Sequence, residues 1–235
     1  MDTMCIPKEE FVAYQKLRDE SFDAWIKAKS QSDYSIFEPY LKKIIEVSKK
    51  MYRYRNSDKN LYDQMLDDYE PGMTQEKYDV FFAALKERLV PLIQKITQAK
   101  QKNEAFLHQE FPIEDQKKFM TQLLEYLHFD SSWGYQNESE HPFTSWTCEN
   151  DCRTTTKYVK NDVVSAVLST VHEVGHAYYE HDVDPKYDGM ILSEGISSGM
   201  HESQSRLCEN YLARTTAFWT YHYPKLQETF PTQLG

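Results

Sequence analysis

The chain has 235 residues, of which 27% are charged and 40% belong to the hydrophobic set, so it can bury a core and has the composition of a soluble globular protein. Its formal charge of -10 argues against nucleic-acid binding, because a surface that binds phosphates presents clustered lysines and arginines. No apolar run is long enough to span a bilayer, so no membrane association is expected.

Three further features concern the chain as a whole. The first ten residues lack a basic segment followed by an apolar run, so no signal peptide is expected. The four cysteines are irregularly spaced, and no second Cys or His pair completes a structural zinc site with Cys148 and Cys152. We therefore expect reduced thiols in a cytosolic protein. Seven glycines and the lack of a Gly/Ser-rich or Pro-rich linker favour a single domain over residues 1–235.

Apolar residues recur at helical spacing over the first half of the chain. The pattern predicts helices over residues 8–28, 35–54, 60–68, 74–102 and 113–126. The segment 69–72 reads as a turn, and Pro91 is expected to kink or divide the fourth of these helices.

The composition changes at residues 131–158, where glycine, asparagine, proline, serine and threonine indicate loops. Residues 153–159 are rich in threonine and other β-prone residues, which predicts a short strand or hairpin. Helix resumes after Asn161 or Asp162, either of which can cap it, and a further helix is expected at 196–216. The fold class predicted is mainly α, with a small β element beside the helix that begins near residue 162.

That helix carries the pattern H-E-x-x-H at residues 172–176. Positions i and i+4 of a helix share a face, so the imidazoles of His172 and His176 can reach one metal ion. The helix's apolar stripe runs directly into these two residues, which places them on its buried side. Glu173 points away from the face that the two histidines share, where it can accept a proton from a metal-activated water rather than bind the metal. Two histidine ligands and a glutamate base are the minimum set of residues that a zinc peptidase needs.

Two histidines leave a catalytic zinc site incomplete, because such sites usually take three protein ligands. The longer pattern H-E-x-x-H-x-x-G-x-x-H fails here, since Tyr179 replaces its glycine and Asp182 its last histidine. His181 lies on the wrong face of the helix. The third ligand must then come from the following segment, where spacing alone leaves four candidates: Glu194, His201, Glu202 and Glu209.

Four motifs occur in order over about sixty-five residues, a combination far more specific than any one of them. They are His141-Pro142-Phe143, Asp151-Cys152-Arg153-Thr154-Thr155, the H-E-x-x-H segment, and His201-Glu202-Ser203-Gln204-Ser205-Arg206. With these motifs the chain resembles the carboxypeptidase Taq family of zinc metallocarboxypeptidases, and the turn at 69–73 also resembles that family.

The resemblance implies a helical, zincin-like metallopeptidase with its metal site within residues 141–209. It assigns Glu202 as the third ligand of Zn2+ beside His172 and His176, and Glu173 as the general base. The implied substrates are peptides, from which C-terminal amino acids are released with broad specificity. The family is often homodimeric, so self-association is expected as well.

Two further residues of the motifs are candidates for substrate binding. Arg153 could grip a substrate carboxylate bidentately, or it could pair with Asp151 or Glu149 to hold the loop, and the second role is slightly favoured. His141 could line the cleft and hydrogen-bond substrate, or it could stabilise the turn before Pro142.

The chain departs from the family pattern in one large respect. Members are considerably longer, and their C-terminal half carries the motifs I-R-x-x-A-D and G-x-x-Q-D-x-H-W, neither of which occurs here. The chain therefore resembles the N-terminal half of such an enzyme. A second hypothesis follows from this: a catalytically weak zinc-binding half that acts through a partner, either a second copy or a complementing C-terminal half. Such a half would expose an apolar face.

Overall fold

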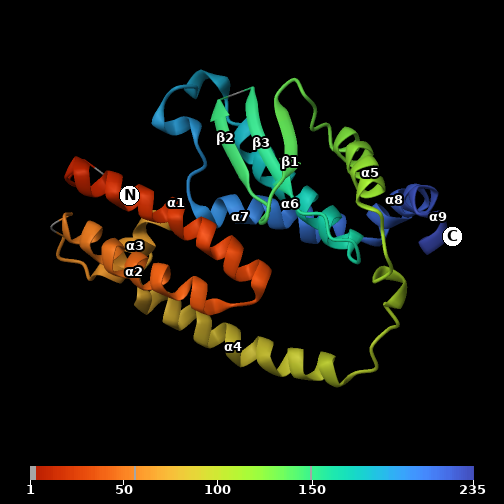
Figure 1. Ribbon diagram of the computed structural model, residues 1–235, viewed down its shortest axis with the longest axis horizontal. Helices are drawn as coiled ribbons and strands as arrows, with labels where there is room; N and C mark the ends of the chain where they lie inside the picture. The colour runs from red at the N-terminus through yellow and green to blue at the C-terminus, as the bar shows by residue number, and fades with distance from the viewer. Residues whose placement is uncertain (1–3, 56, 149) are drawn as a thin grey trace. The chain divides into compact units, whose positions relative to one another are not determined.

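The computed structural model describes residues 4–55, 57–148 and 150–235. Its internal contacts group the chain into an N-terminal unit, Met1–Gln98, and a C-terminal unit, Ala99–Gly235, coloured red to yellow and green to blue in Figure 1. The expectation of one domain over residues 1–235 stays a prediction. Among the described residues, no helix is both long and apolar enough to cross a membrane.

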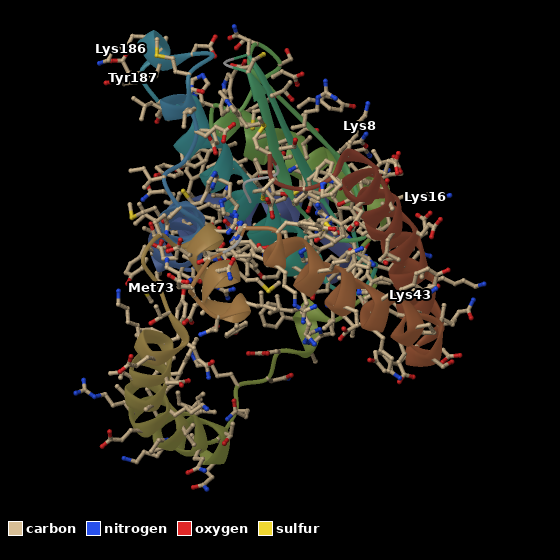
Figure 2. The ribbon with its side chains drawn as sticks, turned by 90° about the vertical axis from the view of Figure 1, so that its left-hand side faces the viewer. Lys8, Lys16, Lys43, Met73, Lys186 and Tyr187 are labelled. Atoms are coloured by element: carbon tan, nitrogen blue, oxygen red, sulfur yellow. The ribbon has the colours of Figure 1, made fainter. Side chains whose placement is uncertain are left out.

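The N-terminal unit is helical, and its helices confirm those predicted before residue 70. Its α-helices are α1 (Lys8–Gln31), α2 (Glu38–Arg53), α3 (Leu61–Tyr69) and α4 (Gln75–Gln98), and a 3-10 turn lies at Tyr34–Ile36. α1 packs on α2, and α2 packs on α3. Charged side chains such as Lys8, Lys16 and Lys43 extend outward from α1 and α2 (Figure 2).

α4 continues through Pro91, so the predicted division of this helix does not occur. Proline removes the backbone donor that would pair with the carbonyl of Glu87. Residues 79–98 are all exposed, so water can take the place of that donor. The helix ends at Gln98, four residues before the predicted end.

Asp68 on α3 joins this helix to the end of α2. Its carboxylate accepts a hydrogen bond from the Tyr52 hydroxyl at 2.6 Å and one from Arg55 Nη2 at 2.6 Å. Burial raises the pKa of Asp68, but Tyr52 and Arg55 lower it by more, so its pKa lies below the usual value. The ionised carboxylate is therefore the form that stabilises the unit.

The C-terminal unit surrounds a central helix, α6 (Val163–His181), which packs against the sheet, α5 and the helical segment that follows it. Asp162 caps α6 by accepting a hydrogen bond from the Ser165 N–H at 2.9 Å. The other helices of the unit are α5 (Ile113–Tyr126), α7 (Ser198–Arg206), the π-helix η5 (Leu207–Ala213), α8 (Thr216–Thr229) and α9 (Pro231–Leu234).

Residues 131–158, expected to be loops with a short strand or hairpin, contain a three-stranded sheet. Its strands are β1 (Gly134–Glu138), β2 (Thr144–Cys148) and β3 (Asp151–Thr156), in the order β1-β3-β2. β1 is parallel and β2 antiparallel to β3. The prediction misses β1 and β2 because each has only five, mostly polar residues, whose pairing depends on β3. The fold class itself is confirmed: mainly helical, with a small sheet beside α6.

The predicted helix at 196–216 is also more divided than expected. Ser197 caps α7 by accepting a hydrogen bond from the Met200 N–H, and the helix widens into the π-helix η5 after Arg206. Thr215 then caps a separate helix, α8. Threonine at this position offers its hydroxyl to the exposed backbone N–H groups of a new helix, which favours a fresh start over continuation.

The core of the C-terminal unit is built from α5, α6 and α8. Phe111 and Phe230 are fully buried and meet edge to face, with ring centroids 5.1 Å apart. Along α6 the valines at 163, 167, 171 and 174 are all buried. Val163, Val167 and Val171 belong to the predicted apolar stripe, and together with Val174 they fix the rotation of α6 and hence the direction of the residues between them.

We expect Asp68→Asn to lower the free energy of unfolding by about 1–3 kcal/mol at neutral pH, because hydrogen bonds to a charged group are weakened. The folded pKa is depressed, so this stabilisation is present above the unfolded pKa of about 3.9 and is lost as the pH falls through the folded value. Denaturant unfolding over a pH series measures it, with exposed Asp58→Asn as the control. If the difference in unfolding free energy between Asp68→Asn and wild type stays the same at low pH, this explanation is contradicted.

Candidate metal centre

The two histidines of the H-E-x-x-H segment lie together on one face of α6. The ring centroids of His172 and His176 are 4.9 Å apart, and the side chain of each is 17% exposed. They are therefore mostly shielded from water but still reachable. This arrangement follows from the i, i+4 spacing and from the buried valine stripe beside them.

Gly175 lets α7 approach this face of α6 closely. A Cβ at this position would lie 2.8 Å from the Cα of Ser205 and 3.0 Å from the carbonyl oxygen of Gln204. Only a residue without a side chain fits this distance. The close approach brings Glu202, on the same helix α7, opposite the two histidines.

Glu202 points one carboxylate oxygen at both imidazoles. Its Oε2 lies 3.5 Å from Nε2 of His172 and 3.4 Å from Nε2 of His176. The candidate ligand atoms of the three residues all lie within 4.8 Å of one another. Its other oxygen, Oε1, accepts a hydrogen bond from Nε of Arg206 at 2.7 Å. The carboxylate thus both pairs with Arg206, as a surface acid would, and faces the histidines.

The pKa of Glu202 indicates that it is ionised. Partial burial raises this pKa, but the hydrogen bond from Arg206 and the nearby His172 lower it by more. Glu202 therefore supplies a negative charge at the point where the three side chains meet.

His172 is held from behind by Glu209, at 2.9 Å between its Nδ1 and the Glu209 Oε2. Glu209 is buried and also accepts hydrogen bonds from Arg206 at 3.0 Å and from Arg214 at 2.6 Å. Burial raises the pKa of Glu209, but Arg214 and His172 lower it by more, so it is ionised. An ionised carboxylate only accepts hydrogen bonds, so His172 must donate from Nδ1. Nε2, the nitrogen that faces Glu202, is then the one through which His172 would bind a metal.

The donor set fits a zinc ion. Burial, together with the neighbouring His201 and His172, lowers the pKa of His176 to about 4, so its imidazole is neutral at neutral pH. Two imidazoles and one carboxylate are a common ligand set of catalytic zinc. Oε2 of Glu202 lies 3.5 Å and 3.4 Å from the two Nε2 atoms, so a cation placed between them would be attracted by the carboxylate charge.

Glu173 lies next to the three candidate ligands and is 6% exposed. The hydroxyl of Thr144, on β2, contacts its Oε2 at 2.7 Å and its backbone oxygen at 2.9 Å. Burial raises the pKa of Glu173, and the bond from Thr144 opposes that rise. The side chain is thus oriented by the sheet and has a pKa moved towards neutrality, which suits a group that both takes and returns a proton.

The two remaining motif residues, His141 and Arg153, have different surroundings. His141 is exposed, and its charge acts on Glu173, lowering the Glu173 pKa. Arg153 instead makes a two-pronged ion pair with Asp151, at 2.8 Å for each contact. It lies on the exposed face of β3, whereas its strand neighbours Cys152 and Thr154 are buried. This geometry favours the structural role of Arg153, and its substrate-binding role stays a prediction.

Several contributors to this site could not be assigned from the sequence. His201 and Glu209 are candidates on spacing, yet both contact the Nδ1 side of a histidine rather than the point where the three ligands meet. Glu209 follows Glu202 by seven residues, about two helical turns, which is the only sequence signal for its place. Thr144 follows the H-P-F motif directly, with no spacing that points to Glu173.

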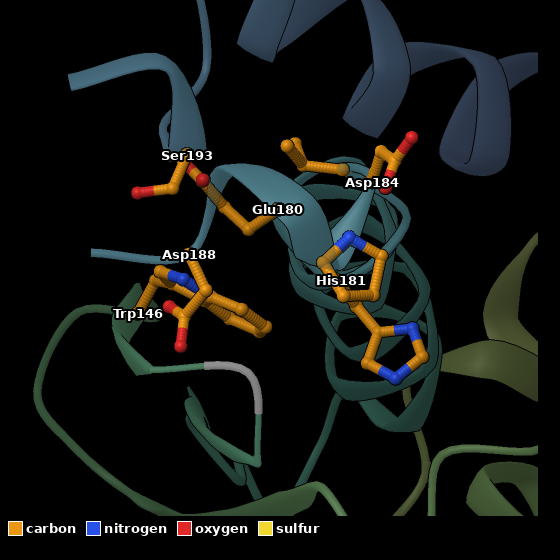
Figure 3. Close-up of a pocket in the computed structure, with 8 residues that line it drawn as sticks. Trp146, Glu180, His181, Asp184, Asp188 and Ser193 are labelled. Carbon is orange, nitrogen blue, oxygen red and sulfur yellow. The ribbon is translucent and has the colours of Figure 1, made fainter. Parts of the chain in front are cut away.

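A separate pocket lies at the C-terminal end of α6 (Figure 3). None of the three candidate ligands lines it. The lining residues are Trp146, Glu180, His181, Val183, Asp184, Pro185, Asp188 and Ser193.

Comparison with known proteins identifies the family. The model of the carboxypeptidase Taq (M32) metallopeptidase family matches residues 2–235. The chain belongs to this family. It is 40% identical over 229 residues to Carboxypeptidase 1 of Bacillus subtilis, covering 97% of this chain and 46% of that protein.

Solved M32 structures have the same fold. The crystal structure of BsuCP superposes with a TM-score of 0.92 at 40% identity, covering 97% of this chain and 46% of that one. The M32 carboxypeptidase from Deinococcus radiodurans R1 gives a TM-score of 0.84 at 34% identity, covering 98% of this chain and 46% of that one. The chain thus spans about half the length of the M32 relatives it matches.

We expect Gly175→Ala to destabilise this M32 chain by about 1–3 kcal/mol, because the added methyl group collides with the backbone of α7. Helix propensity alone would favour alanine by about 1 kcal/mol, so a loss of stability isolates the collision. Moving α7 away should also weaken Zn2+ binding. Denaturant unfolding and zinc titration measure the two effects, with exposed Ser165→Ala on the same helix as control. Unchanged stability together with unchanged affinity would show that the close approach is not required.

Proposed function

We propose that this chain carries the zinc site and general base of a metallocarboxypeptidase that releases C-terminal amino acids from peptides with broad specificity. The observation that carries the proposal is the convergence of His172, His176 and Glu202, with Glu173 beside them. His172, His176 and Glu202 would hold Zn2+. When bound, zinc supplies a Lewis acid that polarises a carbonyl group and makes a nearby water more acidic.

The residues of the chain supply the proton transfer. Glu173 in its ionised form takes a proton from the attacking water and returns it to the leaving amine. Its raised pKa supports this role, because a base that is too weakly basic would not hold the proton between the two events. Thr144 fixes the orientation of the carboxylate, and Arg206 holds Glu202 towards the histidines.

The substrate, compartment and assembly state are also proposals. The name of the Bacillus subtilis relative supports removal of C-terminal residues, since H-E-x-x-H alone also fits other peptidases. Cys148, Cys152 and Cys208 are free thiols in the part of the chain that the structure describes, which suits the reducing cytosol. A homodimer is proposed from the family resemblance.

We expect Glu173→Gln to reduce hydrolysis of an N-blocked dipeptide by about two to four orders of magnitude, because the amide cannot accept the proton. Bound zinc should remain at the wild-type ratio, since Glu173 is not one of the three ligands. Release of the C-terminal amino acid and metal content measure the two quantities.

Glu194→Gln, at an exposed acid on the loop before α7, is the matched control and should leave turnover unchanged. Turnover that survives in Glu173→Gln would refute the assignment of the base. Zinc binding without turnover in the wild-type chain would instead favour the second candidate below.

The second candidate is a catalytically weak zinc-binding chain that acts through a partner, either a second copy or a complementing C-terminal half. The exposed apolar surface of α4 supports it, since this helix has no buried residue. One face carries a continuous stripe at spacings of three and four, with exposed fractions of 40–56%: Phe81, Leu85, Leu89, Leu92 and Ile96. Exposed apolar stripes of this kind usually mark an interaction surface.

If this stripe mediates self-association, the double variant Leu85→Glu/Leu92→Glu should raise the dissociation constant of the dimer by at least about tenfold, because charges would be buried in an apolar contact. Sedimentation velocity over a concentration series measures it. Gln94→Glu, on the opposite face of the same helix, controls for added charge. A monomeric wild-type chain would leave the C-terminal half as the partner of this candidate, to be tested by co-purification.

A further inference from the structure

The two candidate histidine ligands are held from behind in different ways. His172 contacts the carboxylate of Glu209 directly. His176 instead contacts another imidazole, with 2.7 Å between its Nδ1 and the Nδ1 of His201. The far nitrogen of His201, Nε2, lies 2.6 Å from Oε1 of Glu180. A three-membered chain therefore runs from Glu180 through His201 to His176.

The hydrogen bonds of this chain can point in only one direction if His176 binds metal. Glu180 acts as an acceptor, because it also receives the Gly195 N–H at 3.3–3.4 Å. If His176 binds metal through Nε2, its proton lies on Nδ1, so Nδ1 of His201 must accept and Nε2 of His201 must donate to Glu180. His176 must donate from its own Nδ1 to that acceptor. Its Nε2 is left with a lone pair, and this atom is the one that faces Glu202.

We propose that His201, oriented by Glu180, is a positioning residue that fixes the tautomer and ring orientation of His176 for metal binding. This inference rests on the zinc site proposed above and adds two residues to it. A histidine ligand usually donates its second N–H to a carboxylate, a backbone carbonyl or water, and loss of that partner weakens metal binding. Here the acceptor is the imidazole of His201. Because His201 itself donates to the carboxylate of Glu180, its Nδ1 is a stronger hydrogen-bond acceptor for His176.

The surroundings of His201 hold its ring in the required orientation. A Cβ at Gly195 would lie 2.7 Å from Cδ2 of His201 and 2.8 Å from the ring of Tyr179, so the loop backbone presses against both rings. The ring of Tyr179 meets that of His201 edge to face, with centroids 5.0 Å apart. The Glu180 side chain is only 9% exposed, so water competes little for its contact with His201. Packing and hydrogen bonding thus select the same orientation.

Two substitutions of His201 test its two ring nitrogens separately: Nδ1, which contacts His176, and Nε2, which contacts Glu180. In His201→Asn the amide oxygen stands as many bonds from Cα as Nδ1 does, so it can still accept from His176. In His201→Gln the amide stands where Nε2 was, so it can contact Glu180 but not His176. Both variants lose the ring, and Gln fills more of its space than Asn does, so a weaker His201→Gln variant cannot be explained by lost packing.

Zn2+ affinity, measured by competition with a chromogenic chelator at neutral pH, decides the proposal. We expect His201→Gln to bind Zn2+ about 10–100-fold more weakly than wild type, and His201→Asn to stay within about threefold of it. Equal affinities of the two variants, or weaker binding by His201→Asn than by His201→Gln, would overturn the proposal, because a role in packing alone would give either result. A wild-type chain that binds no Zn2+ would refute the proposed zinc site itself, so the two failures can be told apart.

A second variant keeps the test usable if the His201 variants do not fold. Gly195→Ala adds a methyl group that must displace the His201 ring, and it should weaken Zn2+ binding by about tenfold. Ile191→Ala, at a side chain of the same loop that is 96% exposed, is the control. Unchanged affinity in a folded Gly195→Ala variant would overturn the proposal.

Discussion

The close approach of α7 to α6 at Gly175 is the constraint on which the candidate site depends. Two histidines on one helix can face a metal, but they cannot complete its coordination without an acid from a second element. The contact at Gly175 brings the backbone of Ser205 near enough for Glu202, one turn earlier, to reach between the imidazoles. The valine stripe of α6 and the wider π-helix after α7 hold this geometry from either side.

Charge is balanced around the site although the chain as a whole is acidic. Glu202 and Glu209 bring two carboxylates close to His172, and Arg206 contacts both of them. Without Arg206 the two acids would repel each other and favour protonation. Arg214 pairs with Glu209 as well, so Glu202 is the carboxylate that stays directed at the Nε2 atoms of both histidines. Arg206 offsets the charge of the two acids. Glu209 behind His172, and Glu180 behind His201 and His176, determine which histidine nitrogen is available to bind a metal.

The sequence predicted the parts of this site that depend on local spacing. The H-E-x-x-H pattern and the valine stripe were sufficient to place His172 and His176 on one buried face. Spacing could not separate Glu202 from His201 and Glu209, because all three lie within two turns and each does contact a histidine. Which nitrogen each one faces depends on the packing of α7 against α6. The family resemblance chose Glu202, and the strands β1 and β2 were missed because their pairing is likewise a tertiary effect.

The metal site and the exposed stripe belong to different compact units, and this bears on the choice between the two proposed functions. The three candidate ligands and the residues behind them all lie in the C-terminal unit, within residues 141–214. The stripe on α4 lies in the N-terminal unit. The residues that would hold the metal are thus all supplied by the C-terminal unit. Turnover needs in addition a surface that binds the peptide. The M32 relatives are about twice as long as this chain, and the additional residues can supply such a surface. A chain that binds zinc tightly and cleaves slowly is thus physically coherent, because coordination and substrate grip have separate origins.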